Sequence, residues 1–325
     1  MRTIQSFGEQ VIGNLEKVIV GKRDAIELIV IGLLCQGHVL IEDVPGVGKT
    51  MLARSLARSL ACTFNRIQFT PDMLPSDVTG ISIYNQQKRI FEFRPGPIVG
   101  QVILADEINR ATPKTQAALL EAMEEHQVTV DGVTHILPRP FMVLATQNPI
   151  EYEGTFPLPE AQLDRFLLRV RLGYPDFMDE VKILDEQRLK HPIESLKAVV
   201  KSKEVLDAAK AVRAIFLSPA VKRYITDLTR RTRQSGDIYL GASPRGTLAL
   251  ARSSQARAAL NGRDHVLPDD VKDMAVPVLG HRIIVSPAAR LRELSADRIV
   301  QEIVHNTPAP GGDFHTPPPE KKKVK

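Results

Sequence analysis

Residues 42–50 (EDVPGVGKT) place glycines, a lysine and a threonine at a spacing suited to binding phosphate. Gly46 and Gly48 let the backbone turn so that its amide groups converge on anionic oxygens. Lys49 is placed to contact the outer phosphates of a nucleotide, and Thr50 to bring its hydroxyl to Mg²⁺. Asp43 stands where the full phosphate-loop pattern has glycine. The alternative interpretation is a strand-to-helix turn that merely contains glycines.

Two later segments end in side chains suited to phosphoanhydride hydrolysis. The apolar run 102–105 (VILA) leads into Asp106, which suits the orientation of Mg²⁺ and its waters, and Glu107, which suits a general base. The run 141–145 (FMVLA) leads to Asn148, whose amide suits a hydrogen bond to the attacking water or the γ-phosphate. Paired acids are commonly a solvated strand end, and such asparagines are commonly turn residues. The order of all three groups nevertheless predicts a nucleotide-hydrolysing site.

A parallel sheet is needed to bring these groups together. The predicted strands are 38–41, 64–69, 102–105, 141–145 and 166–172, of which the last has charged interruptions. The predicted helices around them are 4–18, 22–36, 51–60 and 113–125. Such sheets bind ligands at the carboxyl ends of their strands. Residues 70–80 are predicted to be a loop because of their prolines and glycine. Two hairpins are predicted, at 81–93 and 128–137.

Beyond Pro175 the strand pattern stops. Helical periodicity follows at 176–190, 203–215, 219–233, 244–261, 268–279 and 295–304. We therefore predict an α/β nucleotide-binding core over residues 1–174, an all-helical lid domain over 175–306 and a disordered basic tail over 307–325.

The composition is that of a soluble globular protein. Of the 325 residues, 43% are hydrophobic and 25% are charged. There is no Trp and aromatic residues make up 5%, which argues against a surface that binds nucleic acid by base stacking. The net charge of +5 includes the lysines of the tail and indicates little about a DNA partner. Without a signal-peptide pattern or a membrane-spanning run, we expect a cytoplasmic protein with no membrane insertion.

Five blocks of sequence carry a family resemblance. They are residues 69–80 (FTPDMLPSDVTG), 93–97 (FRPGP), 104–125, 145–149 (ATQNP) and 156–166 (FPLPEAQLDRF). With these blocks the chain resembles an AAA+ ATPase of the MoxR group, nearly continuously over residues 18–171. The resemblance is looser in the helical region, where residues 241–246 (GASPRG) fall at the position of the family's sensor-2 motif. It implies a P-loop NTPase fold of the AAA+ type, in which the two hairpins correspond to the helix-2 insert and the hairpin before sensor 1.

The resemblance also implies a set of binding roles. ATP would be held by the loop and its flanking residues, namely Pro45, Gly46, Val47, Gly48, Lys49, Thr50, Met51 and Asp106. Val20 and Gly21 would line the adenine pocket, and Thr50 with Asp106 would hold Mg²⁺. Asp43 is compatible with these roles because the family tolerates variation at that position.

The catalytic roles follow from the same resemblance. Glu107 would be the catalytic acid of the Walker B pair, Asn148 the sensor-1 residue and Arg245 the sensor-2 residue. Arg165 would be an arginine finger that enters the site of the neighbouring subunit. Two alternatives stay open: Arg165 forms only a local ion pair with Asp164 or Glu160, and sensor 2 acts either in its own subunit or in an adjacent one.

The function that the resemblance implies is ATP hydrolysis that drives chaperone-like remodelling, assembly or metal-cofactor maturation of partner proteins. The implied partners are other copies of the chain in a ring, a hexamer, together with a von Willebrand factor A domain protein and a client enzyme. A motor acting on nucleic acid is the alternative from another class, but the core and lid leave no room for a DNA-binding module. A scaffold that binds nucleotide without hydrolysis is a third, against which Glu107 and Asn148 argue.

Overall fold

The computed structural model describes residues 2–148, 154–186 and 191–311, which form two compact units. The core unit is Ser6–Ala209, and the helical unit consists of residues 2–5 and 210–311. The core unit reaches past residue 174 and includes the helices α7 (Phe177–Glu186) and α8 (Pro192–Ser195). The division at residue 174 stays a prediction for where the nucleotide-binding domain ends.

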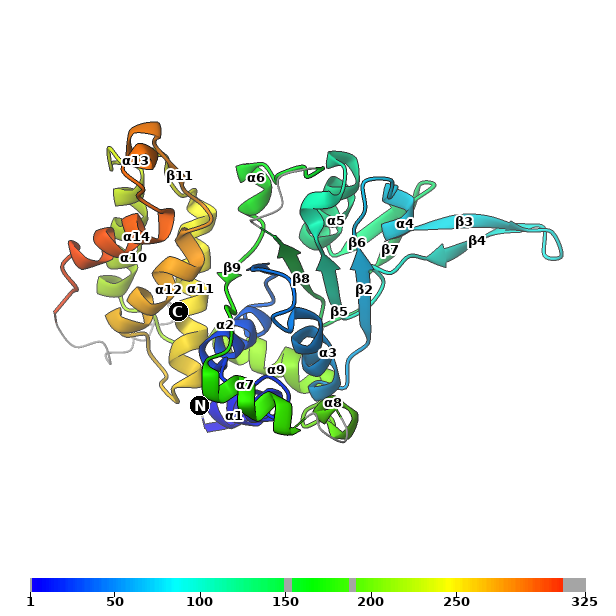
Figure 1. Ribbon diagram of the computed structural model, residues 1–325, viewed down its shortest axis with the longest axis horizontal. Helices are drawn as coiled ribbons and strands as arrows, with labels where there is room; N and C mark the ends of the chain where they lie inside the picture. The colour runs from blue at the N-terminus through cyan, green and yellow to red at the C-terminus, as the bar shows by residue number, and fades with distance from the viewer. Residues whose placement is uncertain (1, 149–153, 187–190, 312–325) are drawn as a thin grey trace, which may run out of the picture. The chain divides into compact units, whose positions relative to one another are not determined.

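A five-stranded sheet forms the centre of the core unit, and all its strands run parallel (Figure 1). Across the sheet, the order is β2 (Phe64–Gln68), β5 (Val102–Asp106), β8 (Met142–Gln147), β1 (Val39–Glu42) and β9 (Leu168–Val170). Every residue of β5 is buried, as are all residues of β1 and β8 except the last of each. The continuous apolar runs in the sequence therefore correspond to strands that are covered on both faces, as predicted.

The four helices predicted around the sheet are present. They are α1 (Arg2–Leu15), α2 (Arg23–Leu34), α3 (Lys49–Ser59) and α5 (Pro113–Glu125). Short helices that were not predicted occur as well, among them the 3-10 helix Ile108–Arg110 and α6 (Glu160–Leu163). Residues 70–80, predicted to be a loop throughout, contain a short helix, α4 (Pro75–Thr79). Pro75 occupies a first-turn position that suits its fixed φ angle, and Asp77 Oδ2 accepts the Leu74 N–H at 2.8 Å. These two local features explain why a helix forms here, although the proline content predicted a loop.

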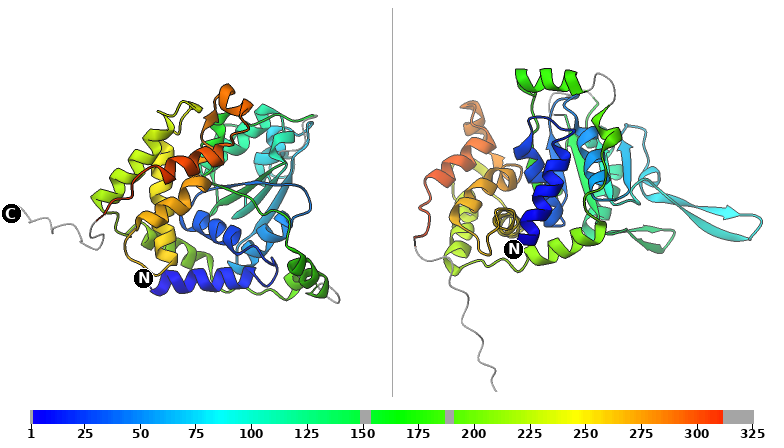
Figure 2. Two further views of the ribbon diagram at one scale, coloured as in Figure 1. Left: turned by 60° about the vertical axis from the view of Figure 1, so that its left-hand side comes forward. Right: turned by 90° about the horizontal axis from the view of Figure 1, so that it is seen from below.

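Both predicted hairpins are present and extend from the same side of the core unit (Figure 2). The first pairs β3 (Gly80–Asn85) with β4 (Ile90–Pro95), and the second pairs β6 (Gln127–Val130) with β7 (Val133–Ile136). Phe93 of the first stacks on His135 of the second, with ring centroids 3.8 Å apart. The first hairpin exposes a set of large apolar side chains, namely Ile81, Ile83, Tyr84, Ile90 and Phe91.

The helices after the sheet match the predicted periodicity. They are α9 (Ser202–Val212), α10 (Pro219–Thr232), α11 (Pro244–Leu260), α12 (Pro268–Leu279) and α14 (Ala296–His305), with the short α13 (Pro287–Leu291). The helical unit also contains a small antiparallel sheet of β10 (Ile238–Leu240) and β11 (Ile284–Val285), strands too short for any alternation to reveal.

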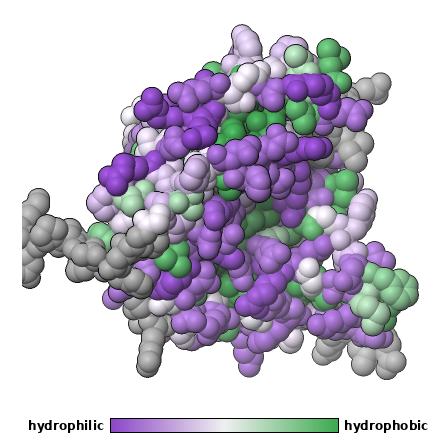
Figure 3. Space-filling view, turned by 90° about the vertical axis from the view of Figure 1, so that its left-hand side faces the viewer, coloured by the Kyte–Doolittle hydropathy of each residue, from purple (hydrophilic) through white to green (hydrophobic). Residues whose placement is uncertain are grey.

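Hydrophilic residues dominate the molecular face drawn in Figure 3, with hydrophobic residues visible between them. Of the predicted tail, residues 312–325 lie outside the described residues. None of the helices in the described ranges combines the length and the apolar content that crossing a bilayer requires.

Asp43 joins the start of the glycine loop to the chain that leaves β9. Its Oδ2 accepts the backbone N–H groups of Leu172 and Gly173, at 2.6 and 2.7 Å. Its Oδ1 accepts the N–H of Val44 at 2.9 Å, and the residue is only 8% exposed. A glycine at this position would leave these backbone donors without the carboxylate, so the departure from the phosphate-loop pattern has a structural role.

His38 connects three elements of the core. Its Nδ1 accepts the Val143 N–H of β8, and its Nε2 lies 3.0 Å from the Met123 carbonyl of α5, so Nε2 carries the proton of a neutral ring. The ring packs edge-on against Phe141, with centroids 5.4 Å apart. Burial lowers the pKa of His38 to about 4, helped by the nearby His126.

We predict that Asp43→Asn lowers the free energy of unfolding by about 1–3 kcal/mol, because an amide nitrogen would face a buried N–H donor. Urea unfolding measures this difference. Asp131→Asn, at an exposed hairpin turn where asparagine is well accepted, is the matched control and should change little. Wild-type stability in the Asp43→Asn variant would contradict the joining role of Asp43.

We also predict that His38 makes the free energy of unfolding decrease as the pH is lowered. The pKa of His38 in the folded protein, about 4, lies below its value of about 6.5 in the unfolded chain, so the unfolded chain takes up the proton first. The contribution of neutral His38 to the free energy of unfolding is fully present above about pH 6.5. It is lost as the pH falls towards 4, by up to about 3 kcal/mol. His38→Gln should flatten the pH dependence of urea unfolding in this range. His305→Gln, at an exposed position, is the control and should leave the pH dependence unchanged. If the free energy of unfolding depends on pH equally in the wild type and in His38→Gln, the prediction is wrong.

Candidate active site

A cavity of about 340 Å³ lies at the carboxyl edge of the parallel sheet. Strand register explains its position, because Glu42 of β1 pairs with Gln147 of β8 and Gln68 of β2 pairs with Asp106 of β5. The strand ends are therefore level, and the segments that follow them face one space. The cavity is lined by Pro45, Gly46, Gly48, Lys49, Thr50, Met51, Arg66, Asp106, Glu107 and Asn148.

The glycine loop has the geometry of a phosphate cradle. Gly46 and Gly48 have φ angles of +87° and +89°, and a Cβ atom built on either would meet nothing within 4 Å. Helix α3 begins directly after Gly48, which directs its N-terminal amides and positive dipole end to the cavity. Lys49 is only 9% exposed, and its Nζ donates to the Asp43 carbonyl at 2.8 Å. The loop thus offers amides, a helix terminus and a buried ammonium group to an anion.

The cavity also contains oxygen ligands that fit a magnesium ion. Thr50 brings a hydroxyl and Asp106 a carboxylate to the same lining, and oxygen donors are those that Mg²⁺ prefers. Within the described ranges, no group of three His, Cys, Asp or Glu side chains is arranged to hold a metal. A magnesium ion would therefore complete its coordination with phosphate oxygens and water, as it does in many nucleotide sites.

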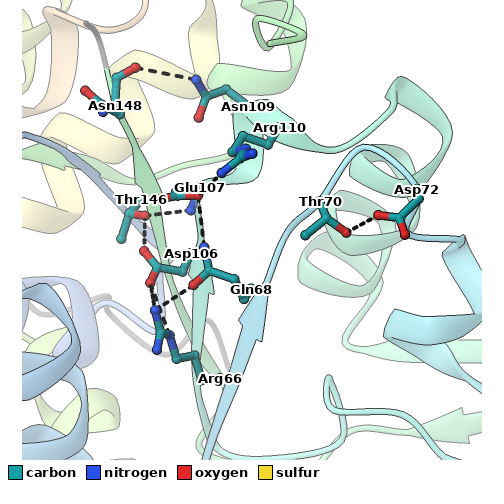
Figure 4. Close-up of polar contacts among 10 residues, drawn as sticks. All are labelled: Arg66, Gln68, Thr70, Asp72, Asp106, Glu107, Asn109, Arg110, Thr146 and Asn148. Carbon is teal, nitrogen blue, oxygen red and sulfur yellow. Dashed lines mark hydrogen bonds and ion pairs between the residues drawn. The ribbon is translucent and has the colours of Figure 1, made fainter. Parts of the chain in front are cut away.

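Asp106 is held at both carboxylate oxygens (Figure 4). Its Oδ1 accepts the hydroxyl of Thr146, at the end of β8, at 2.6 Å. Its Oδ2 accepts Nη2 and Nε of Arg66, on β2, at 2.6 and 3.1 Å. Thr146 Oγ1 in turn accepts the backbone N–H of Glu107 at 2.8 Å. The hydroxyl of Thr146 therefore fixes the two acids relative to β8.

Two side chains bind the carboxylate of Glu107. Its Oε2 accepts Nε2 of Gln68 at 2.9 Å and Nη1 of Arg110 at 3.1 Å (Figure 4). Its φ angle is +56°, in the left-handed region that costs a side-chain-bearing residue roughly 1–2 kcal/mol. Strain of this kind persists where surrounding structure imposes it and is concentrated at functional positions.

Asn148 completes the cavity from the end of β8. The residue is 6% exposed, and its backbone carbonyl accepts Nδ2 of Asn109 at 3.4 Å. Asn148 therefore lines the same cavity as Lys49 and the two acids.

The structure does not bring every predicted site residue to this cavity. Among the described residues, Val20, Gly21 and Val47 are outside its lining. Gly21 instead packs closely against the Asp179 carboxylate of α7. Arg165 also lies outside the lining, and its Nε is 3.1 Å from Glu124 Oε2 of α5, a partner that the sequence alternatives did not include. Arg245 lies exposed in the first turn of α11, in the helical unit.

Five polar residues of this network were not found from the sequence: Arg66, Gln68, Asn109, Arg110 and Thr146. Arg66 and Gln68 lie two positions apart on one strand and so share a face of the sheet, next to the strand that ends in the acids. This two-residue spacing along the strand is the sequence signal that could have identified Arg66 and Gln68.

Comparisons with known proteins give the family. Residues 38–168 match the model described as ATPase family associated with various cellular activities (AAA), and residues 230–303 match an AAA lid domain. The chain is 39% identical to Chaperone MoxR1 of Mycobacterium tuberculosis over 93% of this chain and 82% of that protein. It is 52% identical to YeaC of Bacillus subtilis over 92% and 93% of the two chains.

A solved structure agrees with these matches. The crystal structure of a protein from Cytophaga hutchinsonii, described as a candidate ATPase, has a TM-score of 0.88 at 39% identity and covers 95% of this chain and 96% of that one. Likeness at this level along nearly the whole chain, in both sequence and fold, means that the protein belongs to the MoxR family of AAA+ ATPases and is an enzyme that hydrolyses ATP.

Proposed function

We propose that the chain hydrolyses Mg·ATP in the cavity at the sheet edge and uses the energy to remodel, assemble or mature partner proteins as a ring. The observation that carries this proposal is the convergence of Lys49, Asp106, Glu107 and Asn148 on one cavity from separate strand ends. In this arrangement phosphate binding, metal orientation and water activation are available within one small volume.

The glycine loop would bind the phosphates. Backbone amides at Gly46 and Gly48, the N-terminus of α3 and the ammonium group of Lys49 all offer positive charge to them. Thr50 and Asp106 would hold Mg²⁺, which when bound neutralises phosphate charge and orients the γ-phosphate. The predicted roles of Val47 as a loop contact and of Val20 and Gly21 at the adenine remain part of the proposal.

Glu107 would act as the general base. Gln68 and Arg110 hold its Oε2, which fixes the carboxylate at the cavity. A carboxylate fixed in this way can polarise a water and accept its proton, an effect of typically about 10²–10⁴-fold in rate. Asn148 would orient the same water or the γ-phosphate through its amide.

A ring of subunits, a hexamer, would complete each site. Lys49 supplies a cation from within the subunit, and Arg165 would supply a second one across an interface, as arginine fingers in trans do. Its ion pair with Glu124 on α5 would hold it in place until a neighbouring nucleotide is available. Arg245 would sense the nucleotide from the lid.

The β3–β4 hairpin supports work on protein partners. It extends away from the sheet (Figure 1), and its apolar side chains are exposed, with Phe91 at 72%. Exposed apolar groups of this kind mark sites of protein contact. The expected partners are a client enzyme and a von Willebrand factor A domain protein, with metal-cofactor maturation as one outcome. Nothing in the described residues favours the alternative of action on nucleic acid.

We predict that Glu107→Gln keeps nucleotide affinity but slows hydrolysis at least about 100-fold, because the amide cannot accept the proton of the attacking water. Steady-state turnover and binding of a fluorescent ATP analogue measure the two effects separately. Glu121→Gln, which removes the same charge from an exposed position of α5, should keep normal turnover. Near-normal turnover in Glu107→Gln would mean that another group activates the water.

We also predict that Arg165→Ala loses on the order of 10³-fold in turnover while it still binds nucleotide. Glu124→Ala removes the other half of the ion pair and is the matched control. If Arg165 acts in trans, only Arg165→Ala should lose activity, and mixing it with inactive Glu107→Gln should restore part of the turnover. Equal losses in Arg165→Ala and Glu124→Ala, with no recovery in rings shown to be mixed, would favour the local ion pair.

A further inference from the structure

Arg66 is a second cation in the ATP cavity, and the phosphate-loop and acid motifs do not include it. It lies on β2, and its guanidinium lines the cavity together with Lys49. Nη2 and Nε both bond to Asp106 Oδ2, and Nη2 also donates to Gln68 Oε1 at 2.6 Å. The side chain is 46% exposed, whereas that of Asp106 is 12% exposed. Arg66 is therefore the more exposed partner of the pair, and Asp106 is the more enclosed one.

The environment of Asp106 requires a cation. A carboxylate with so little access to water is unfavourable unless opposite charge and hydrogen bonds compensate for its lost hydration. Thr146 satisfies Oδ1 with a neutral hydroxyl, so Arg66 at Oδ2 supplies the positive charge. Oδ2 is thus the oxygen at which a second cation would have to replace the first.

We propose that Arg66 and Mg²⁺ compete for Asp106. When no metal is bound, Arg66 would neutralise the carboxylate, and when Mg²⁺ binds with nucleotide, Oδ2 would turn from the guanidinium to the metal or its waters. The inference rests on the proposed function, because it takes Asp106 as the magnesium residue. The carboxylate would then have one cationic partner with or without the metal, so its buried charge would be compensated in both cases.

The displaced guanidinium has a place within the same site. Because Arg66 already lines the cavity, a rotation of its half-exposed side chain keeps it there. The exchange therefore needs movement of one side chain and no change in the sheet.

The experiment follows binding of a fluorescent, non-hydrolysable ATP analogue as Mg²⁺ is added. The Mg²⁺ concentration at half-saturation is measured for the wild type and for Arg66→Gln. Without the competing cation, this concentration should fall about fivefold, the scale of a partly exposed ion pair. Binding of Mn²⁺ to the analogue complex, followed by electron paramagnetic resonance, should tighten by a similar factor. Neither readout depends on turnover.

Arg231→Gln is the matched control. It removes the same charge from an arginine of α10 that is 41% exposed and pairs with Asp227, and neither of these two residues lines the cavity. Its Mg²⁺ requirement should equal that of the wild type. Arg66→Lys keeps the charge but cannot form the forked contact, so it should give a smaller decrease and also serves if Arg66→Gln does not fold.

Two outcomes would overturn the inference. An unchanged Mg²⁺ requirement in Arg66→Gln, or in Arg66→Lys where only that variant folds, would mean that Arg66 does not compete. An increased requirement would mean that Arg66 helps to hold the metal–nucleotide complex. A different result would reject the proposed function itself. This is the case if the wild type binds the analogue no more tightly than Lys49→Ala does.

Discussion

The parallel pairing of β1 between β8 and β9 is the constraint on which the site depends. Val39 to Glu42 pair in register with Leu144 to Gln147, and β5 pairs with β8 through Ala105 and Ala145. This register levels the strand ends, so the glycine loop, the two acids and Asn148 open into one cavity although they are far apart in the chain. A slip by one residue would turn every buried side chain of a strand to the opposite face, so core packing protects the geometry of the site.

Buried carboxylates define the local structure at this edge, and each has a different set of partners. Asp43 accepts backbone donors from the chain after β9 and thereby attaches the phosphate loop to the last strand of the sheet. Asp106 accepts a hydroxyl from β8 and a guanidinium from β2, so it links three adjacent strands. Since an unpartnered buried carboxylate is strongly unfavourable, these contacts attach the loop to the chain after β9 and the acid pair to β2 and β8.

The acid pair divides its tasks through the surroundings of each member. Asp106 lies in the strand and is enclosed, which suits a fixed charge near a metal. Glu107 lies one residue beyond, in a left-handed conformation that turns the chain into the short helix Ile108–Arg110. This turn directs two consecutive side chains into one cavity, although alternation along a strand would place them on opposite faces. The left-handed backbone at Glu107 is thus the structural condition that brings the proposed base beside the acid proposed to hold the metal.

The sequence by itself determined the five strands of the central sheet, the two hairpins, most of the longer helices and the residues of the phosphate loop and acid pair. These features depend on local periodicity, glycine conformation and the chemistry of adjacent residues, all of which are written in short stretches of chain. The tertiary structure alone decided that Arg66 reaches Asp106, that Gln68 holds Glu107, that Asp43 binds the chain after β9 and that Arg165 pairs with Glu124. Each of these contacts joins residues about 40 or more positions apart, and periodicity carries no information about which distant side chains a given register and helix packing bring within hydrogen-bonding distance.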